Sequence, residues 1–260
     1  MKGSIKMVNI LLCGCCGFMG RMICDCASSY EDINITAGVD LVDDGMRKFP
    51  VYKAIENVSV PVDVIIDFSH PSLLDGVLEY AEKHHVPAVL ATTGLSEEQK
   101  RKIVKSSENV PLFFTANISI GINVISELVK NAVSVLGLDY DIEIVEKHHR
   151  RKLDAPSGTA LMLADAAASA REIPSEYIYD RHSVRKPRSV NDIGISAVRG
   201  GTIVGEHDVI FAGEDEVITI SHSAGSRKVF AVGAIRAALF INGKDNGLYD
   251  MSALIKENMK

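Results

Sequence analysis

The chain has 260 residues, 47% of them hydrophobic and 24% charged, and its 28 basic and 34 acidic side chains give a formal net charge of −6. This negative balance gives no general attraction to phosphate backbones or anionic lipid, which excludes nucleic acid and membrane surfaces as default partners. No apolar run in the sequence approaches the roughly 18 residues needed to cross a bilayer. The composition therefore favours a globular protein and small-molecule chemistry.

The N-terminal segment starts with lysines and continues into an apolar stretch, a pattern that secretory signal peptides share. Asn9 and several glycines interrupt the stretch, and no small-residue cleavage pattern comes before Arg21, so a buried strand followed by a glycine turn is the better interpretation. The cysteines gather in the same region and cannot staple distant parts of a fold; they are Cys13, Cys15, Cys16, Cys24 and Cys26. We expect a reducing, cytoplasmic location.

Short apolar runs alternate with amphipathic runs through the first half of the chain, as in a parallel sheet whose strands are joined by helices. The expected strands are Val8–Cys13, Asn34–Val39, Val62–Phe68, Ala88–Ala91 and Pro111–Thr115. The expected helices are Met19–Tyr30, Pro71–His84 and Ser96–Ser106, the last with a capping-box start at Ser96. These elements predict a doubly wound α/β half.

The pattern changes after Asn117. We expect helices at Asn123–Leu136 and Leu161–Ala170, strands at Asp141–Lys147, Ile193–Arg199, His207–Phe211 and Val217–Ser221, and a basic loop from Tyr179 to Arg188. The last three strands are β-branched and have no full-length helix between them, which predicts a mixed or antiparallel second sheet. An apolar helix at Val229–Phe240 is expected to pack back on the first half.

A glycine-rich turn, Gly14-Cys15-Cys16-Gly17-Phe18-Met19-Gly20, joins the first expected strand to the first expected helix. Glycines allow a sharp turn and close approach to a pyrophosphate, and the following helix N-terminus favours an anion. Asp40 ends the second strand, where a carboxylate would accept hydrogen bonds from the adenosine ribose hydroxyls. This combination indicates a nicotinamide cofactor, although a plain strand-to-helix turn and a solvated strand end stay open.

A second cluster of titratable groups runs from Glu146 to Ala160, just before an expected helix. Lys and Arg neighbours disfavour the imidazolium form of a histidine, which suits proton transfer near neutral pH. Lys152 would neutralise a substrate carboxylate or donate a proton, and Ser157, Gly158 and Thr159 would present hydroxyls and N–H groups to a second carboxylate at a helix start. The cluster indicates an anionic, dicarboxylate substrate, with a capped basic surface loop as the alternative.

Neither cluster predicts a metal site. Cys24 and Cys26 would face different sides of a helix, so the cysteines are interpreted as small packing residues. Adjacent His148 and His149 point to opposite faces of an extended segment, and no third ligand follows at metal spacing. The remaining histidines, His207 among them, have no such company and are interpreted as surface or core-edge residues.

Over almost its whole length the sequence resembles the dihydrodipicolinate reductase family. The resemblance is carried by the glycine turn, Asp67-Phe68-Ser69, Ala91-Thr92-Thr93-Gly94, Ala116–Gly121, His148–Ala160 and Arg199–His207. It implies a Rossmann-type parallel-sheet dinucleotide-binding domain over residues 1–118, completed by 229–260, and an inserted mixed α/β domain over 119–228 for substrate binding and tetramer assembly. The implied reaction is NAD(P)H-dependent reduction of 4-hydroxy-tetrahydrodipicolinate to tetrahydrodipicolinate with loss of water, in lysine biosynthesis via the diaminopimelate pathway.

The resemblance also implies residue roles. His148 matches the general acid/base position and Lys152 the proton donor. Substrate carboxylate contacts match His149, Lys152, Ser157, Gly158 and Thr159. Cofactor contacts match Gly14, Cys15, Cys16, Gly17, Phe18, Met19, Asp40, Ala91, Thr92, Thr93, Thr115, Ala116, Asn117 and Ile118. A homotetramer with a small dicarboxylate substrate is the implied assembly, without nucleic acid or membrane partners.

Two departures from the family pattern bear on the cofactor. Phe18 stands where many relatives carry Arg, and Leu41 follows Asp40 where some carry an Arg for the 2′-phosphate. We therefore predict that NADH is used at least as well as NADPH, although Arg47 and Lys48 are near enough in sequence to compensate. Two other functions stay open: an amino-acid-pathway dehydrogenase of the same plan, and a nucleotide-sensing protein that would not need His148 and Lys152.

Overall fold

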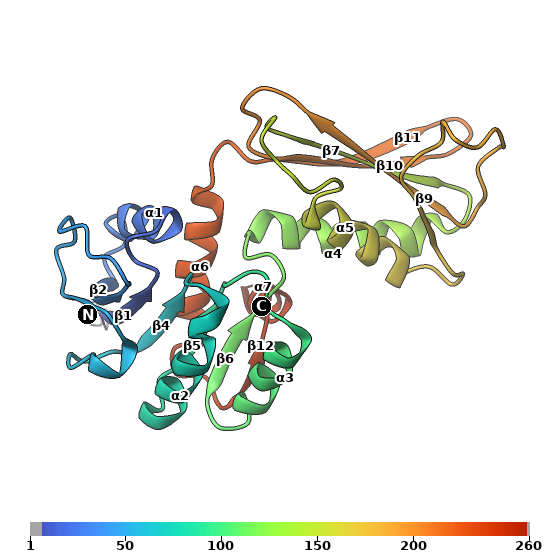
Figure 1. Cartoon of the computed structure of the whole chain (residues 1–260). Coiled ribbons are helices and arrows are strands. Elements are labelled where there is room, and N and C mark those ends of the chain that lie inside the picture. The colour runs from blue at the N-terminus through green and yellow to red at the C-terminus, as the bar shows by residue number, and fades with distance from the viewer. Residues whose placement is uncertain (1–6, 259–260) are drawn as a thin grey trace. The chain divides into compact units, whose positions relative to one another are not determined.

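The computed structural model describes residues 7–258, which form two compact units. The first unit contains the described residues up to Ser119 and those from Lys228 onward, and the second contains Ile120–Arg227. The first unit is therefore built from two separate stretches of chain, with the second unit inserted between them. Blue to green elements and red elements combine in the first unit (Figure 1).

The first unit contains a seven-stranded sheet in which every strand pairing is parallel, ordered β12-β6-β5-β4-β1-β2-β3. Its strands are β1 (Val8–Cys13), β2 (Ile33–Val39), β3 (Val51–Tyr52), β4 (Val64–Asp67), β5 (Ala88–Leu90), β6 (Pro111–Phe114) and β12 (Gly247–Tyr249). The chain leaves β1 toward β2 on one side and later returns to β4 on the other. A crevice for a ligand is expected at this switch point, at the carboxyl ends of β1 and β4.

Helices cover both faces of this sheet (Figure 1). On one face α2 (Leu74–His84) and α3 (Glu97–Ser106) pack over Leu11 and Cys13 of β1. Because side chains alternate along a strand, Ile10 and Leu12 are buried on the opposite face. There α1 (Phe18–Ala27) packs against α6 (Lys228–Ile241), and α6 contacts β4, β5 and β6. The C-terminal helix α7 (Met251–Asn258) contacts α6.

The second unit contains a five-stranded mixed sheet in the order β11-β10-β7-β9-β8. Its strands are β7 (Asp141–His148), β8 (Glu176–Ile178), β9 (Asp192–Arg199), β10 (Glu206–Ala212) and β11 (Val217–Ser223). The β7–β9 and β8–β9 pairs are parallel and the other two pairs antiparallel. Helices α4 (Ile120–Leu136) and α5 (Gly158–Ser169) form an apolar layer with the buried residues of this sheet.

The predicted fold class, a Rossmann-type parallel sheet with a second mixed α/β part, is confirmed. The predicted helix from Pro71 is wrong in its first turn, which is a 3-10 helix (η2, Pro71–Leu73) whose start His70 caps by accepting from the Ser72 N–H. A second 3-10 turn, η1, covers Ile55–Asn57. The strands absent from the predictions, β3, β8 and β12, have only two or three residues each, too few for a hydrophobic pattern to mark them.

Candidate active site

The glycine turn of the first unit is held together by close backbone contacts that exclude a side chain. Gly14 has φ +77°, and a Cβ there would lie 2.6 Å from the Phe68 carbonyl oxygen. A Cβ on Gly20 would lie 2.2 Å from the carbonyl oxygen of Gly14, so α1 can approach the turn only because Gly20 has no side chain. Gly17 is the N-cap of α1 and no described side chain caps this helix. The positive end of α1 therefore faces a tight turn suited to an anion.

Asp40 lies directly beside this turn. Its carboxylate accepts a hydrogen bond from the Cys16 N–H at 2.9 Å, which brings the end of β2 against the loop after β1. Two nearby cations are already engaged, because Arg21 and Arg47 both pair with Asp44 at 3.2 Å. The structure thus brings Asp40 to the glycine turn, as a ribose-binding carboxylate would require.

The predicted threonines lie at the carboxyl ends of β5 and β6. The Thr92 hydroxyl donates to the Asp67 carboxylate at 2.7 Å, and the Ser69 N–H donates to the same group at 3.0 Å. Burial raises the pKa of Asp67, although these hydrogen bonds oppose the rise. The Thr115 hydroxyl donates to the Asn117 carbonyl at 3.1 Å. These segments sit at the edge of the sheet where β1 and β4 also end.

In the second unit the buried face of β7 changes from apolar to ionisable at its carboxyl end. Ile142 and Ile144 face the helices, and the next two residues on that face are Glu146 and His148. Glu146 is fully buried, and its carboxylate lies 2.6 Å from the His148 Nδ1. The strand therefore presents a carboxylate–imidazole pair where an ordinary strand would continue its hydrophobic core.

Three further donors hold the Glu146 carboxylate. Arg199, on the adjacent β9, donates from Nη1 at 2.7 Å and from Nη2 at 2.6 Å, one to each oxygen. The Ser157 N–H donates at 3.0 Å. Burial alone raises the pKa of Glu146, but the hydrogen bonds from Arg199, His148 and Ser157 outweigh it and hold the pKa below its ordinary value. Glu146 is therefore an anion at neutral pH, and His148 Nδ1 faces that anion.

A second buried histidine completes the cluster. His207 of β10 is only 3% exposed, and its Nε2 lies 3.0 Å from the Ser157 hydroxyl, which in turn accepts from the Ala160 N–H and caps α5. Burial, followed by the charge of His148, lowers the pKa of His207 to about 4, so the ring is neutral at physiological pH. The rings of His148 and His207 meet edge to face at 5.2 Å.

The loop between β7 and α5 carries the predicted cationic residues. Lys152 pairs with Asp154 at 2.9 Å, and the Asp154 carbonyl accepts from Arg199 at 2.6 Å. Burial and the positive charges of Arg227 and Arg151 lower the pKa of His149. The loop is thus an electropositive segment that leads to the N-terminus of α5, which indicates affinity for carboxylates.

The residues that match two family models span nearly the whole chain. The model described as dihydrodipicolinate reductase, N-terminus, matches residues 8–118, and the one described as dihydrodipicolinate reductase, C-terminus, matches residues 121–255. The chain belongs to the dihydrodipicolinate reductase family. The resemblance inferred from the sequence motifs is confirmed.

Individual relatives support the same assignment to the dihydrodipicolinate reductase family. The 4-hydroxy-tetrahydrodipicolinate reductase of Clostridium tetani is 49% identical over 249 residues, which cover 96% of this chain and 97% of the relative. That of Caldanaerobacter subterraneus subsp. tengcongensis is also 49% identical, over 96% and 99% of the two chains. A dipicolinate-bound dihydrodipicolinate reductase from Paenisporosarcina sp. TG-14 has the same fold, with a TM-score of 0.79 at 24% identity over 94% and 97% of the two chains.

The structure places the predicted reductase residues in two groups, one in each unit. The glycine turn, Asp40 and the Thr92 and Thr115 segments gather at one sheet edge of the first unit, and His148, His149 and Lys152 lie at or just after the end of β7 in the second. One interpretation is corrected: His207 is a buried partner of Ser157 rather than a surface or core-edge residue. The Ser157 hydroxyl is likewise engaged inside the protein, with Ala160 and His207.

Sequence reasoning gave no role to Glu146, Arg199 or His207. Strand pairing brings these residues together: β10 places His207 opposite Glu146, and β9 places Arg199 opposite His148. Strand order and register decide these neighbours, and one sequence shows neither. The sequence motifs of the reductase therefore identified only part of the cluster, and the pairing of β7 with β9 and β10 supplies the rest.

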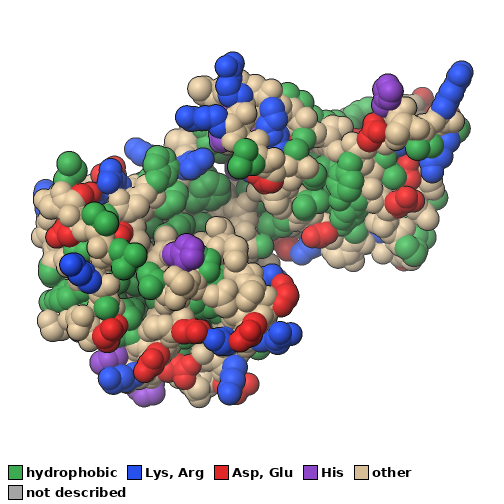
Figure 2. All heavy atoms as spheres, in the orientation of Figure 1, with side chains coloured by type: hydrophobic (Ala, Val, Ile, Leu, Met, Phe, Trp, Pro, Cys, Tyr) green, Lys and Arg blue, Asp and Glu red, His purple; other side chains and the backbone are tan. Residues whose placement is uncertain are grey.

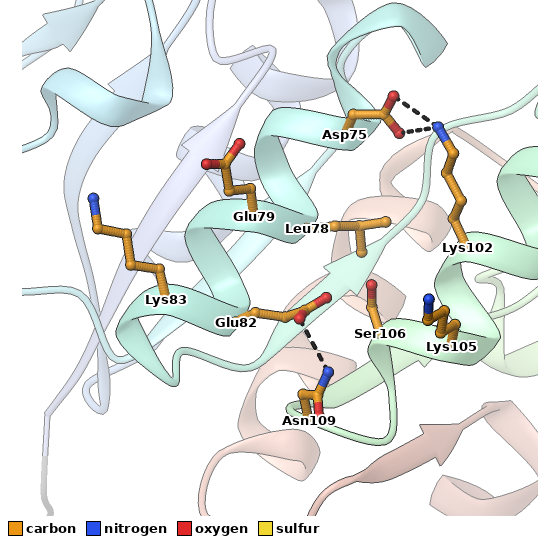
Figure 3. Close-up of a pocket in the computed structure, with 9 residues that line it drawn as sticks. All are labelled: Asp75, Leu78, Glu79, Glu82, Lys83, Lys102, Lys105, Ser106 and Asn109. Atoms are coloured by element: carbon orange, nitrogen blue, oxygen red, sulfur yellow. Dashed lines mark hydrogen bonds and ion pairs between the residues drawn. The ribbon is translucent and has the colours of Figure 1, made fainter.

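One surface hollow of the first unit lies away from these residues. It occupies about 530 Å³ between α2 and α3, and Asp75 and Lys102 pair across it at 2.9 Å (Figure 3). None of the predicted site residues lines it. Three acidic and three basic side chains line the hollow, so its charge is mixed. Acidic and basic side chains are likewise interspersed over the visible face of this unit (Figure 2).

Proposed function

We propose that this chain catalyses the NAD(P)H-dependent reduction of 4-hydroxy-tetrahydrodipicolinate to tetrahydrodipicolinate with loss of water, in lysine biosynthesis through the diaminopimelate pathway. The observation that carries the proposal is the match to named reductases at 49% identity over 96% of the chain. The carboxylate–imidazole pair at the end of β7 supplies a physical basis for proton transfer.

The first unit fits a nicotinamide dinucleotide. The pyrophosphate would meet the backbone of Gly14–Met19, where a Cβ on Gly14 or Gly20 would collide with backbone, and Asp40 would accept from the ribose. Residues 91–93 and 115–118 would line the nicotinamide end, since they follow β5 and β6 at the same sheet edge. When bound, the cofactor supplies the hydride.

The second unit supplies the substrate site in this proposal. His149, Lys152, Gly158 and Thr159 lie on the loop after β7 or at the start of α5, and Ser157 contributes by capping that helix. A helix N-terminus with adjacent cations stabilises carboxylates, and the substrate has two. Lys152 is paired with Asp154 in this structure, and a bound carboxylate would compete with Asp154 for the Lys152 ammonium.

Proton supply follows from the balance of the reaction. Replacing a hydroxyl by hydride and releasing it as water consumes one proton for each hydride transferred, so the site needs a proton donor. Lys152 fills this role, and its ammonium also orients a carboxylate. His148 acts as the acid/base: its Nδ1 is engaged with Glu146, which leaves Nε2 as the ring nitrogen for the substrate.

The finer cofactor choice is proposed as NADH used at least as well as NADPH. Asp40 repels a 2′-phosphate, and the side chains at Phe18 and Leu41, which are 60% and 71% exposed, offer it no charge. Arg21 of α1 and Arg47 of the loop after β2 both pair with Asp44. A value of kcat/KM clearly lower for NADH than for NADPH would overturn this choice.

We also propose a cytoplasmic homotetramer that assembles through the second unit. Val198, Val217 and Ile218 are exposed on its strands, at 46%, 63% and 37%, and apolar residues on an uncovered sheet are typical of subunit interfaces. No helix within residues 7–258 is long and apolar enough for a bilayer crossing. Light scattering after size-exclusion chromatography measures the mass; a monomer would overturn the tetramer.

The decisive experiment follows nicotinamide absorbance while a purified synthase generates the unstable substrate from pyruvate and aspartate semialdehyde. Synthase-dependent oxidation of NADH or NADPH is expected, and running both cofactors in parallel measures the preference. Folded protein that binds NADH but oxidises neither cofactor would redirect the proposal to another substrate or to a nucleotide sensor.

A further inference from the structure

The glycine turn carries two adjacent thiols whose sulfur atoms lie together. The Cys15 Sγ and Cys16 Sγ are 3.8 Å apart. A carboxylate oxygen of Asp40 lies within 4.8 Å of both sulfurs, and the Cys16 N–H holds this carboxylate in place at 2.9 Å. Neighbouring side chains in an extended segment point apart, so the turn itself is what brings the two thiols to one side.

We propose that Cys15, Cys16 and Asp40 form a binding site for a soft divalent cation, Zn²⁺ or Cd²⁺, and that an ion bound there competes with the dinucleotide. The sequence favoured packing roles for these cysteines, whereas their geometry suits thiolate ligation.

The sulfur separation matches a tetrahedral ion. With Zn–S bonds of about 2.3 Å, two thiolates at the tetrahedral angle are about 3.8 Å apart, the separation already present. For a Zn–O bond of about 2.1 Å the carboxylate oxygen belongs about 3.6 Å from each sulfur, so Asp40 has to move inward by only about 1 Å from the outer limit of the group. The separation of the two sulfurs therefore already suits the ion.

The fourth position is open to solvent or to a second carboxylate. Cys16 also forms a group with Asp43 and Asp44, whose ligand atoms lie within 4.8 Å of one another. Asp44 is engaged by Arg21 and Arg47, so Asp43 or a water molecule is the better fourth ligand. Three protein ligands with an exchangeable fourth position make a reversible site rather than a structural one.

Simple packing explains Cys15 but not Cys16. Cys15 is fully buried, and a Cβ on Gly38 would lie 2.4 Å from its Sγ, so its sulfur fills space against β2. Cys16 is half-buried as a residue, and its sulfur lies on the inner side of the turn with Cys15 and Asp40. Within residues 7–258, both groups of three close metal-ligating side chains contain Cys16, and neither contains Cys24 or Cys26.

Competition with the dinucleotide follows from shared residues and rests on the proposed function. The turn would hold the pyrophosphate and Asp40 the ribose, and the Asp40 carboxylate cannot ligate an ion and accept from a ribose hydroxyl in the same geometry. Ion binding itself does not rest on that proposal, so the two parts can fail separately.

The test titrates Cd²⁺ into the reduced full-length chain without cofactor and follows the thiolate-to-cadmium charge-transfer band in the ultraviolet. We expect one ion per chain. Cys16→Ser should weaken Cd²⁺ binding at least tenfold and remove about half of the band, because one of two thiolates is lost. Asp40→Asn should weaken binding while keeping the band. Cys24→Ser and Cys26→Ser, which change half-buried thiols on α1, are matched controls that should keep both.

The site is overturned if Cys16→Ser keeps the full band and the unaltered Cd²⁺ affinity, or if Cys24→Ser or Cys26→Ser removes the band. Circular dichroism checks that each variant is folded. Cys15 is buried, so Cys15→Ser can destabilise the turn; the test therefore relies on Cys16→Ser, which changes a half-buried residue. Adding NADH should lower the apparent Cd²⁺ affinity as for a competitor. Unchanged affinity with saturating NADH would overturn the competition and leave the ion site standing.

Discussion

Glu146 holds together the polar cluster at the carboxyl end of β7. It is fully buried, and His148, Arg199 and the Ser157 N–H all bond to its two oxygens. A buried carboxylate is costly unless its charge is paired and hydrogen-bonded, and here each requirement is met by a residue of the site. Glu146 therefore fixes the His148 ring through Nδ1, and in the proposed function this makes it a positioning residue that leaves Nε2 for the substrate.

Replacing Glu146 tests this role. Glu146→Gln should lower kcat about 100-fold, the scale of an acid/base contribution. The KM for NADH should be unchanged, because the residues proposed to bind the cofactor lie in the first unit. Glu146→Asp, which keeps the charge, should recover part of the loss. Steady-state kinetics at saturating NADH measures both.

Glu143→Gln is the matched control for this change. It lies on the same strand and pairs with Arg181 and Arg188 rather than with His148, so kcat should stay near the unaltered value. Equal losses of kcat in Glu143→Gln and Glu146→Gln would reduce Glu146 to a structural ion-pair partner.

His207 makes stability depend on pH. Its pKa is about 4 when folded against 6.5 for an ordinary histidine, so between these values the unfolded chain binds more protons and stability rises with pH. The full penalty, about 3 kcal/mol, applies below pH 4 and disappears above pH 6.5. The charges of His148, Glu146, His222 and Lys152 also act on the pKa of His207.

His207→Gln should flatten this dependence, since an amide can still bond to the Ser157 hydroxyl but does not titrate. Urea unfolding at a series of pH values between 4 and 6.5 should show a slope lower by about one proton. The exposed His182→Gln is the control and should keep the slope. An unchanged slope in His207→Gln would mean that His207 titrates normally in the folded chain.

At the scale of elements, α1 and α2 each contain a glycine with opposite requirements. A Cβ on Gly20 in α1 meets the Gly14 carbonyl oxygen at 2.2 Å, whereas one on Gly76 in α2 meets only a side-chain carbon of Ile55 at 3.7 Å, an ordinary contact. The first helix starts against the glycine turn, and the second packs through larger residues such as Val77 and Leu78.

Gly20→Ala should therefore lower the free energy of unfolding by about 1–3 kcal/mol and weaken NADH binding at least tenfold, because the turn must shift. Gly76→Ala should stabilise by up to about 1 kcal/mol, as Ala does in a helix interior, with NADH affinity unchanged. Thermal unfolding and NADH fluorescence titration measure the two effects. NADH affinity retained in Gly20→Ala would contradict the close-approach argument for the turn.

The elements show why sequence patterns worked in some places and not in others. Val8–Cys13 was predicted with its observed bounds because a buried strand next to glycine has sharp limits. The helix expected from Leu161 starts earlier, at Gly158. Its N-cap, Ser157, comes before the apolar run from which the helix was predicted. The Glu146–Arg199 and Ser157–His207 contacts join residues about 50 positions apart, and only strand register reveals them.

At the scale of the whole molecule, the first unit depends on the chain's return after the second. Helix α6 contacts β4, β5, β6 and α1, and β12 adds an edge strand to β6. Helix α6 has small buried residues, among them Ala231, Ala234 and Ala238, which let it lie close to the sheet. These contacts join residues far apart in the sequence. The part of the first unit before Ser119 therefore cannot complete its core until the segment from Lys228 onward has been synthesised.

This arrangement predicts a pattern of hydrogen exchange. NADH at 100 times its Kd should stabilise the first unit by about 2.7 kcal/mol, and the slowest amides of β1, β4 and α6 should gain protection together because they unfold as one core. Dipicolinate, a dicarboxylate like the substrate, should instead protect β7 and α5. Mass spectrometry of exchange with each ligand separates the segments. If NADH protects β1 and leaves α6 unchanged, the C-terminal segment is not part of the cooperative dinucleotide-binding unit.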